Sequence, residues 1–164
     1  LSDLLLALGK FSSAESLLSE ALTATPANHA LTYRLALVYL AQGKGGEARR
    51  KFQEGLTYVE AKIARNKNVS MHHVDEALFQ AHLNNSSKAI AAAREAFRLD
   101  STDDDVAIRI ATMYAVLGNK DAMLRWFGRA KGMNAEYDAA YLATAIDFER
   151  YSRDPDLLLI ARQE

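Results

Sequence analysis

Apolar residues recur at three- and four-residue steps along most of the 164-residue chain, on either side of short turns marked by glycine or asparagine. This spacing places apolar side chains on one face of a helix, so each stretch predicts an amphipathic helix and each turn predicts a helical hairpin. The turn residues Gly9, Gly43, Asn84 and Gly118 follow one another at 34, 41 and 34 residues. Such regular spacing indicates a tandem array of similar hairpins, each packed on its neighbours.

The pattern predicts four hairpins and two closing helices within one solenoid domain that spans residues 1–164. Alanines such as Ala36 and Ala111 are expected where two helix backbones approach closely, and aromatic residues such as Phe52 and Phe127 are expected between hairpins. We expect an all-α superhelix whose last helices cover its open end. The predicted hairpins are about 1–26, 29–65, 70–100 and 103–134, and the predicted capping helices are 137–152 and 155–163.

The seven extra residues between Gly43 and Asn84 predict two added turns in the helix that begins near Gly46. In the third hairpin, direct alignment with the second would bury His73, Glu76 and Gln80, which is costly for unpaired polar groups. We therefore expect this hairpin to slip by one residue and to have a turn one residue shorter than its counterparts. The apolar stripe buried by the slip is Val74, Ala77, Leu78 and Ala81.

These residues resemble the tetratricopeptide repeat, a 34-residue helix pair with small and aromatic residues at the same offsets. The resemblance covers about residues 1–134, extends more weakly to residue 152, and is most complete in hairpins 29–56 and 104–133. It implies a right-handed α-α superhelix whose first helices line a concave face, and a non-catalytic scaffold that binds a peptide or protein. Gly45 and Lys120 replace aromatic residues of the family pattern, and neither substitution breaks the helix pattern.

The resemblance also implies which residues face the concave groove. Apolar side chains predominate among them, and Tyr33 and Leu37 stand where family members that grip acidic tails carry polar residues. This favours a hydrophobic or amphipathic partner segment. The alternative, in which these side chains only pack against neighbouring helices, stays open. The predicted groove residues are Tyr33, Leu37, Leu40, Phe79, His82, Ile108, Thr112, Leu142 and Ile146.

The segments 63–66 and 147–157 resemble the carboxy-terminal repeat arrays of bacterial multidomain signalling proteins. In those proteins similar repeats follow a Ser/Thr kinase, a nucleotide cyclase or a winged-helix regulator. Because the sequence also lacks an initiator methionine, we expect a fragment of a longer chain in which it is the interaction or sensory module. The alternative function is self-association, with Leu4, Leu5 and Leu8 buried in a homodimer.

Composition narrows the function classes further. The chain has 20 lysines and arginines against 21 aspartates and glutamates, which argues against binding of nucleic acid by bulk electrostatics. The absence of cysteine excludes disulfides and thiolate sites, and it fits a cytoplasmic location. No apolar run approaches the ~18 residues that a membrane span needs. We therefore expect a protein or peptide partner, and neither a nucleic acid nor a membrane.

The densest group of potential ligands is His72, His73, Asp75 and Glu76. No helix carries the His-Glu-x-x-His pattern of a zinc site, and no second Glu-x-x-His cluster completes a carboxylate-bridged site, so a solvated helix turn is the favoured interpretation. The glycine-rich residues 42–46 lack the spacing of a phosphate-binding loop, and no serine stands in a nucleophile motif. We expect no enzymatic activity, no cofactor and no metal.

Overall fold

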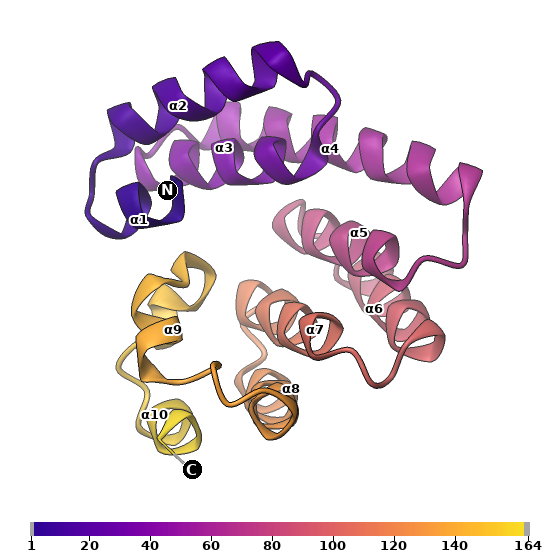
Figure 1. The fold of residues 1–164 in the computed structure, drawn as a ribbon, viewed down its shortest axis with the longest axis vertical. Helices are drawn as coiled ribbons and strands as arrows, with labels where there is room; N and C mark the ends of the chain where they lie inside the picture. The colour runs from indigo at the N-terminus through magenta and orange to yellow at the C-terminus, as the bar shows by residue number, and fades with distance from the viewer. Residues whose placement is uncertain (1, 163–164) are drawn as a thin grey trace.

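The computed structural model describes residues 2–162 as ten α-helices and one 3-10 helix, with no strand in that range. The predicted all-α class is therefore confirmed (Figure 1). The helices are α1 (Ser2–Ala7), α2 (Phe11–Ala24), α3 (His29–Ala41), α4 (Gly45–Arg65), α5 (Ser70–His82), α6 (Ser86–Leu99), α7 (Asp104–Val116), α8 (Lys120–Met133), α9 (Ala139–Thr144), η1 (Ile146–Tyr151) and α10 (Pro155–Ala161).

The same turn joins the two helices of every hairpin. Gly9, Gly43, Asn84 and Gly118 have φ angles of 68°, 74°, 64° and 75°. Glycine adopts this left-handed conformation without steric cost, and asparagine tolerates it better than most residues. The amide of the next residue donates to the carbonyl five residues earlier at 2.8–3.0 Å, which satisfies an end carbonyl of the first helix. The regularly spaced turn residues are thus the points at which each first helix ends.

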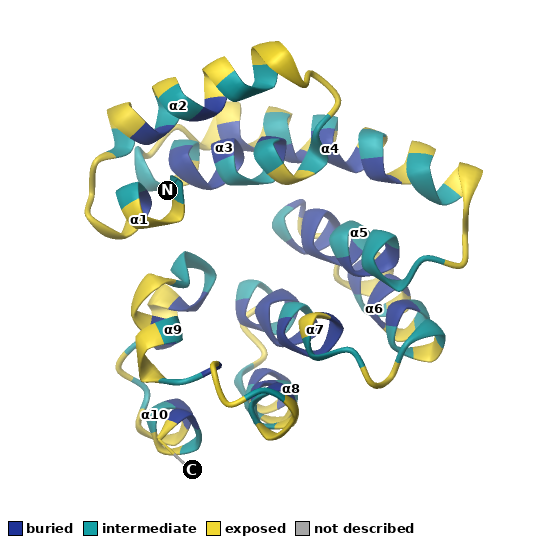
Figure 2. Cartoon of the chain, viewed as in Figure 1, coloured by how far each residue is buried: buried dark blue, intermediate teal, exposed yellow. Residues whose placement is uncertain are grey.

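The hairpins form an arc that places α3, α5 and α7 on its inner side and α4, α6 and α8 behind or outside them (Figure 1). At the end of the arc, α9 contacts α1, and η1 contacts both α7 and α1. The first and last parts of the chain therefore meet across the concave side. Figure 2 shows that α5 and α7 are mostly buried, whereas α2 and the distal end of α4 have exposed faces.

The longest helix, α4, has 21 residues and extends past its neighbours, as the added seven residues predict (Figure 1). At its centre, the buried Gly55 allows close approach of α5. A β-carbon at Gly55 would lie 2.3 Å from Cε1 and 2.4 Å from Cζ of Phe79. The missing side chain at Gly55 therefore makes room for the Phe79 ring.

The predicted slip of the third hairpin is wrong. The turn between α5 and α6 has the same length as the turns between α3 and α4 and between α7 and α8. The slipped apolar stripe is buried, but His73 and Gln80 are buried with it. Each has a hydrogen-bond partner: His73 Nε2 lies 2.8 Å from the Lys67 carbonyl oxygen, and Gln80 Oε1 accepts from Asn85 Nδ2 at 2.8 Å. A first helix is covered on several sides, so it buries more than one stripe.

The predicted capping helix 137–152 is also wrong as a single helix. Ala145 is extended, with φ −83° and ψ 90°, and it separates α9 from η1. The break turns Ile146 toward the amino-terminal core and Phe148 into the carboxy-terminal core. The last helix, α10, begins at Pro155 as predicted, with Asp154 as its N-cap. Its predicted end at residue 163 lies outside the described residues.

Candidate functional site

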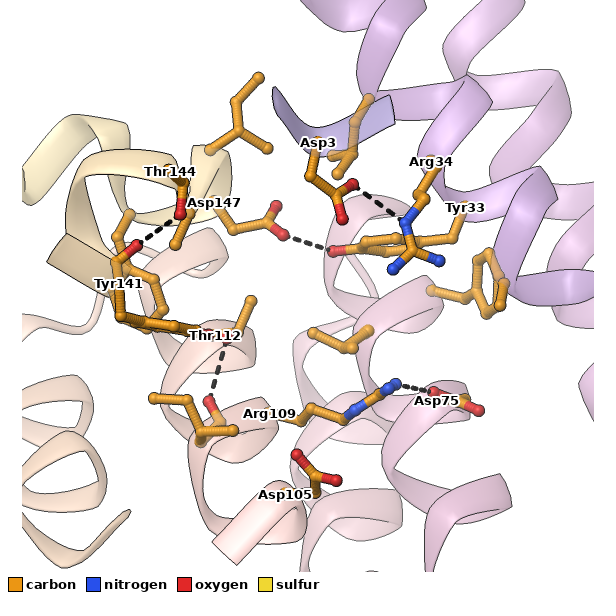
Figure 3. A pocket seen from close by; sticks show the side chains of 18 of the residues that line it. Asp3, Tyr33, Arg34, Asp75, Asp105, Arg109, Thr112, Tyr141, Thr144 and Asp147 are labelled. Carbon is orange, nitrogen blue, oxygen red and sulfur yellow. Dashed lines mark hydrogen bonds and ion pairs between the residues drawn. The ribbon is translucent and has the colours of Figure 1, made fainter. Parts of the chain in front are cut away.

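A cavity of about 330 Å³ lies on the concave side, lined by α3, α5 and α7 and by residues of α1, α9 and η1 (Figure 3). Part of its apolar lining belongs to the protein core, and none of these core side chains is more than 7% exposed. Because core packing holds these side chains, the cavity is preformed. The core residues among its lining are Leu37, Leu78, Phe79, Ile108 and Phe148.

Helical periodicity explains how α7 contributes to the cavity. The side chain of Asp103 caps the helix by accepting a hydrogen bond from the Val106 amide at 3.2 Å. Asp105, Ile108 and Arg109 then follow at three- and four-residue steps and line the cavity together. One turn beyond Ile108, a threonine hydroxyl donates to the Ile108 carbonyl at 3.0 Å, so its polar group is satisfied within the helix. This face combines apolar and charged side chains.

Asp147 of η1 meets two residues from the amino-terminal half of the chain. Its Oδ2 accepts a hydrogen bond from the Tyr33 hydroxyl at 3.0 Å, and its Oδ1 lies 3.3 Å from His82 Nε2. The Tyr33 hydroxyl also lies 3.0 Å from His82 Nε2, and the imidazole stacks on Phe52 with ring centroids 4.1 Å apart. Burial first, and then the Asp147 charge, raise the pKa of Tyr33 well above its usual range. Tyr33 is therefore a neutral donor to Asp147 near neutral pH.

Asp75 is the centre of an ion-pair network on the wall formed by α5. Its Oδ1 accepts from the Arg109 guanidinium, and its Oδ2 accepts from His29 Nε2 at 2.8 Å. Lys62 Nζ donates to Nδ1 of the same imidazole at 3.1 Å, so Nδ1 carries no proton and His29 is neutral in this arrangement. Arg34, the other arginine that lines the cavity, donates from Nε to Oδ1 of Asp3 in α1 at 2.9 Å. Both arginine–aspartate pairs are labelled in Figure 3.

Two tyrosines from the segment around α9 line the remaining side. The Tyr137 hydroxyl donates to Asp104 Oδ2 at 3.0 Å and to Asp105 Oδ1 at 3.2 Å. Burial and these neighbouring carboxylates raise the pKa of Tyr137. Burial first, and then the Asp147 charge, raise the pKa of Tyr141 to about 12. Burial is the larger cause of both pKa shifts, and the neighbouring carboxylates add to it.

The structure brings most of the predicted groove residues together, but not all. Leu40 lines neither of the cavities found and is 45% exposed. Leu142 of α9 lines a different cavity, of about 370 Å³ between α1 and α9. His82 contacts the cavity residue Tyr33 without lining the cavity itself. The predicted residues that do line it are Tyr33, Leu37, Phe79, Ile108, Thr112 and Ile146.

The groove residues predicted from the sequence do not include the charged side chains that line the cavity. Asp105 and Arg109 lie on the same helix face as Ile108, so helical spacing contains the signal that identifies them. Tyr141 and Asp147 carry no such signal, because they lie on either side of a break between α9 and η1 that the sequence pattern does not predict.

Among residues 2–162, no group of three or more histidine, cysteine, aspartate or glutamate side chains is placed to hold a metal ion. Over the same part of the chain, every helix is too short or too polar to span a membrane.

Comparison with known proteins supports the resemblance seen in the repeats. Residues 1–62 match the family model of the tetratricopeptide repeat. The sequence gives no match among curated proteins. The fold is similar to that of a thermophilic TPR protein of Thermus thermophilus, with a TM-score of 0.55, 19% identity, and coverage of 97% of this chain and 84% of that one. A crystal structure of MamA has a TM-score of 0.45 at 16% identity, with 98% and 92% coverage.

Proposed function

We propose that this chain is a non-catalytic scaffold that binds a peptide or protein segment in its concave cavity. Residues 1–62 match the family model of the tetratricopeptide repeat, and α5 to α8 form two further helical hairpins of the same kind. Tetratricopeptide repeat proteins generally act as protein interaction scaffolds. We infer that the described helices form one solenoid domain.

The observation that carries the proposal is the cavity itself. Its volume of about 330 Å³ lies at the lower end of the ~300–1,000 Å³ typical of ligand sites. The lining combines an apolar floor with charged and phenolic groups from helices far apart in the sequence, which is how binding sites gain both affinity and orientation. Since the floor is part of the core, little ordering is needed when a segment binds.

The test is selection of binders from a random peptide library displayed on phage, followed by affinity measurement on the whole chain. Ala30 is exposed on α3 and lines the cavity, so the Ala30→Trp variant fills the cavity without changing the core. The matched control is Ala61→Trp, at an exposed position of α4 away from the cavity. We expect Ala30→Trp to weaken binding at least tenfold and Ala61→Trp to leave it unchanged. Failure to select any peptide, or equal binding by both variants, contradicts the proposal.

A second candidate function is self-association through α1. Leu4 of α1 and Leu8, directly after this helix, are 52% and 59% exposed, and a homodimer would remove them from water. Light scattering of the chain and of a Leu4→Glu, Leu8→Glu variant tests this function. A dimer that the substitutions convert to a monomer supports it, and a monomeric wild-type chain at high concentration contradicts it.

We also infer that the array is the interaction or sensory module of a longer cytoplasmic signalling chain. The support is the resemblance of residues 63–66 and 147–157 to such bacterial arrays. The reading frame upstream of residue 1 tests the inference. A kinase, cyclase or DNA-binding domain encoded there in the same frame supports it, and an in-frame stop codon with no such domain contradicts it.

A further inference from the structure

The charges that line the cavity do not balance. Four aspartates and two arginines line it, so its lining carries a formal charge of −2 when the histidine is neutral. In Figure 3 these side chains project from different sides of the cavity. The six residues are Asp3, Asp75, Asp105, Asp147, Arg34 and Arg109.

The ion pairs already present leave two carboxylates without a cationic side chain. Both arginines already form ion pairs, Arg109 with Asp75 and Arg34 with Asp3. Asp105 accepts a hydrogen bond from a tyrosine hydroxyl. Asp147 accepts one from Tyr33 and faces an imidazole. Within residues 2–162, no arginine or lysine forms an ion pair with Asp105 or Asp147.

Aromatic rings supply a second, independent attraction for a cation. Tyr33, Phe79, Tyr137, Tyr141 and Phe148 all line the cavity. The ring centroids of Tyr137 and Tyr141 are 5.1 Å apart, and those of Tyr141 and Phe148 are 6.4 Å apart. A cation within about 6 Å of an aromatic face is attracted by the ring quadrupole, and more strongly where water is excluded. After burial, the negative charge of Asp147 is the next cause of the raised pKa of Tyr141. A negative charge that disfavours a phenolate also attracts a cation.

We propose that the cavity recognises one positively charged side chain, arginine or lysine, of the bound segment. The charged group lies between Asp105 and Asp147 beside the tyrosine rings, and its aliphatic stem covers the apolar floor formed by Ile108 and Leu78. The volume of about 330 Å³ suits a single long side chain and is too small for a whole helix. This inference rests on the proposed function, because it identifies the chemistry of the segment that binds.

The test uses arginine itself as a probe. Nα-acetyl-arginine amide is titrated into the 15N-labelled chain, and amide chemical shifts are followed in α7, α9 and η1. The uncharged isostere Nα-acetyl-citrulline amide and the anionic Nα-acetyl-glutamate amide are titrated in parallel. We expect saturable shifts around the cavity with the arginine probe, at least fivefold weaker binding of citrulline, no binding of glutamate, and weakening with added salt.

Substitutions then locate the charge. Asp105→Asn and Asp147→Asn each remove one charge and keep an oxygen acceptor, and each is expected to weaken binding of the arginine probe by about threefold to tenfold. Asp121→Asn makes the same charge change at an exposed position of α8 outside the cavity, and it is expected to have no effect. Using both cavity variants keeps the test informative if one of them unfolds.

Each outcome separates this inference from the proposed function. Equal affinity for arginine and citrulline, or shifts outside the cavity, overturns the cation preference. If display peptides bind in a manner sensitive to Ala30→Trp but contain no arginine or lysine, the cation preference fails while the proposed function stands. If the arginine probe binds in the cavity and no peptide does, the cation preference stands while the proposed function fails.

Discussion

Replacing Gly55 by alanine is expected to destabilise the protein, although alanine is the better helix former. The new β-carbon would lie 2.3 Å from Cε1 of Phe79, well inside van der Waals contact. Phe79 is 1% exposed and packs between α4 and the cavity, so its ring has to move toward the cavity. Overpacking of this kind costs about 1–3 kcal/mol, against a gain of about 0.5–1 kcal/mol in helix propensity. The expected net loss is about 1–2 kcal/mol.

Urea unfolding followed by circular dichroism measures this loss as a lower midpoint at an unchanged slope. At this chain length the melting temperature is expected to fall by about 2–8 °C. The control is Gly128→Ala in α8, where the new β-carbon would lie 3.7 Å from Ile160 Cγ2, an ordinary contact. That variant is expected to gain about 0.4–1 kcal/mol.

A double-mutant cycle identifies the cause. Phe79→Leu removes the ring atoms that meet the new β-carbon, so Gly55→Ala is expected to cost less in the Phe79→Leu background than in the wild-type chain. The reasoning is refuted if Gly55→Ala is as stable as the wild type, or if its cost is the same in both backgrounds.

Three further predictions concern the turn residue Asn84, the hydrogen-bonded carboxylate of Asp104, and Asp147 in the terminal segment. Asn84→Ala should lower the unfolding free energy by about 1 kcal/mol because φ there is 64°, whereas Asn84→Gly should not lower it; urea unfolding measures both. Hydrogen bonds from Asn134 and then Tyr137 lower the pKa of Asp104 below 3.8, so its stabilisation is present above that pH and is lost as pH falls through the lower folded pKa. Asp104→Asn should therefore flatten the decline of stability in acid titrations. Asp147→Ala removes the acceptor of a buried hydroxyl, should cost about 1–2 kcal/mol, and should speed amide exchange in α9 and η1.

The hairpins could be predicted from the sequence because local chemistry determines their turns. Gly9, Gly43 and Gly118 meet a backbone requirement that few other residues meet, and Asn84 meets it at the one position where glycine is absent. The spacing of these residues therefore predicts where the first helix of each hairpin ends. The length of α4 agrees with the same spacing, because α4 has 21 residues where α2, α6 and α8 each have 14.

The third hairpin shows where a rule of burial misleads. Polar side chains at His73 and Gln80 suggested that the stripe had shifted, since unpaired polar groups are costly to bury. The partners that remove this cost are a backbone carbonyl of Lys67 and an amide of Asn85, and both become neighbours only through the folded loop and turn. The apolar pattern alone therefore favours a one-residue slip of the third hairpin, whereas its turn has the same length as the other turns.

The cavity depends on the one break that sequence pattern could not reveal. Residues 144–147 contain neither proline nor glycine, so nothing local ends a helix at Ala145. The interactions that favour the break involve residues distant in sequence. Ile146 packs on the amino-terminal core, and the ring centroids of Phe148 and Phe127 are 5.7 Å apart. Asp147 accepts a hydrogen bond from the Tyr33 hydroxyl. A continuous helix would rotate these side chains to other faces and lose some of these contacts. The same break brings the Asp147 carboxylate to the cavity, so the charge proposed to select the partner comes from a tertiary contact rather than from the repeat.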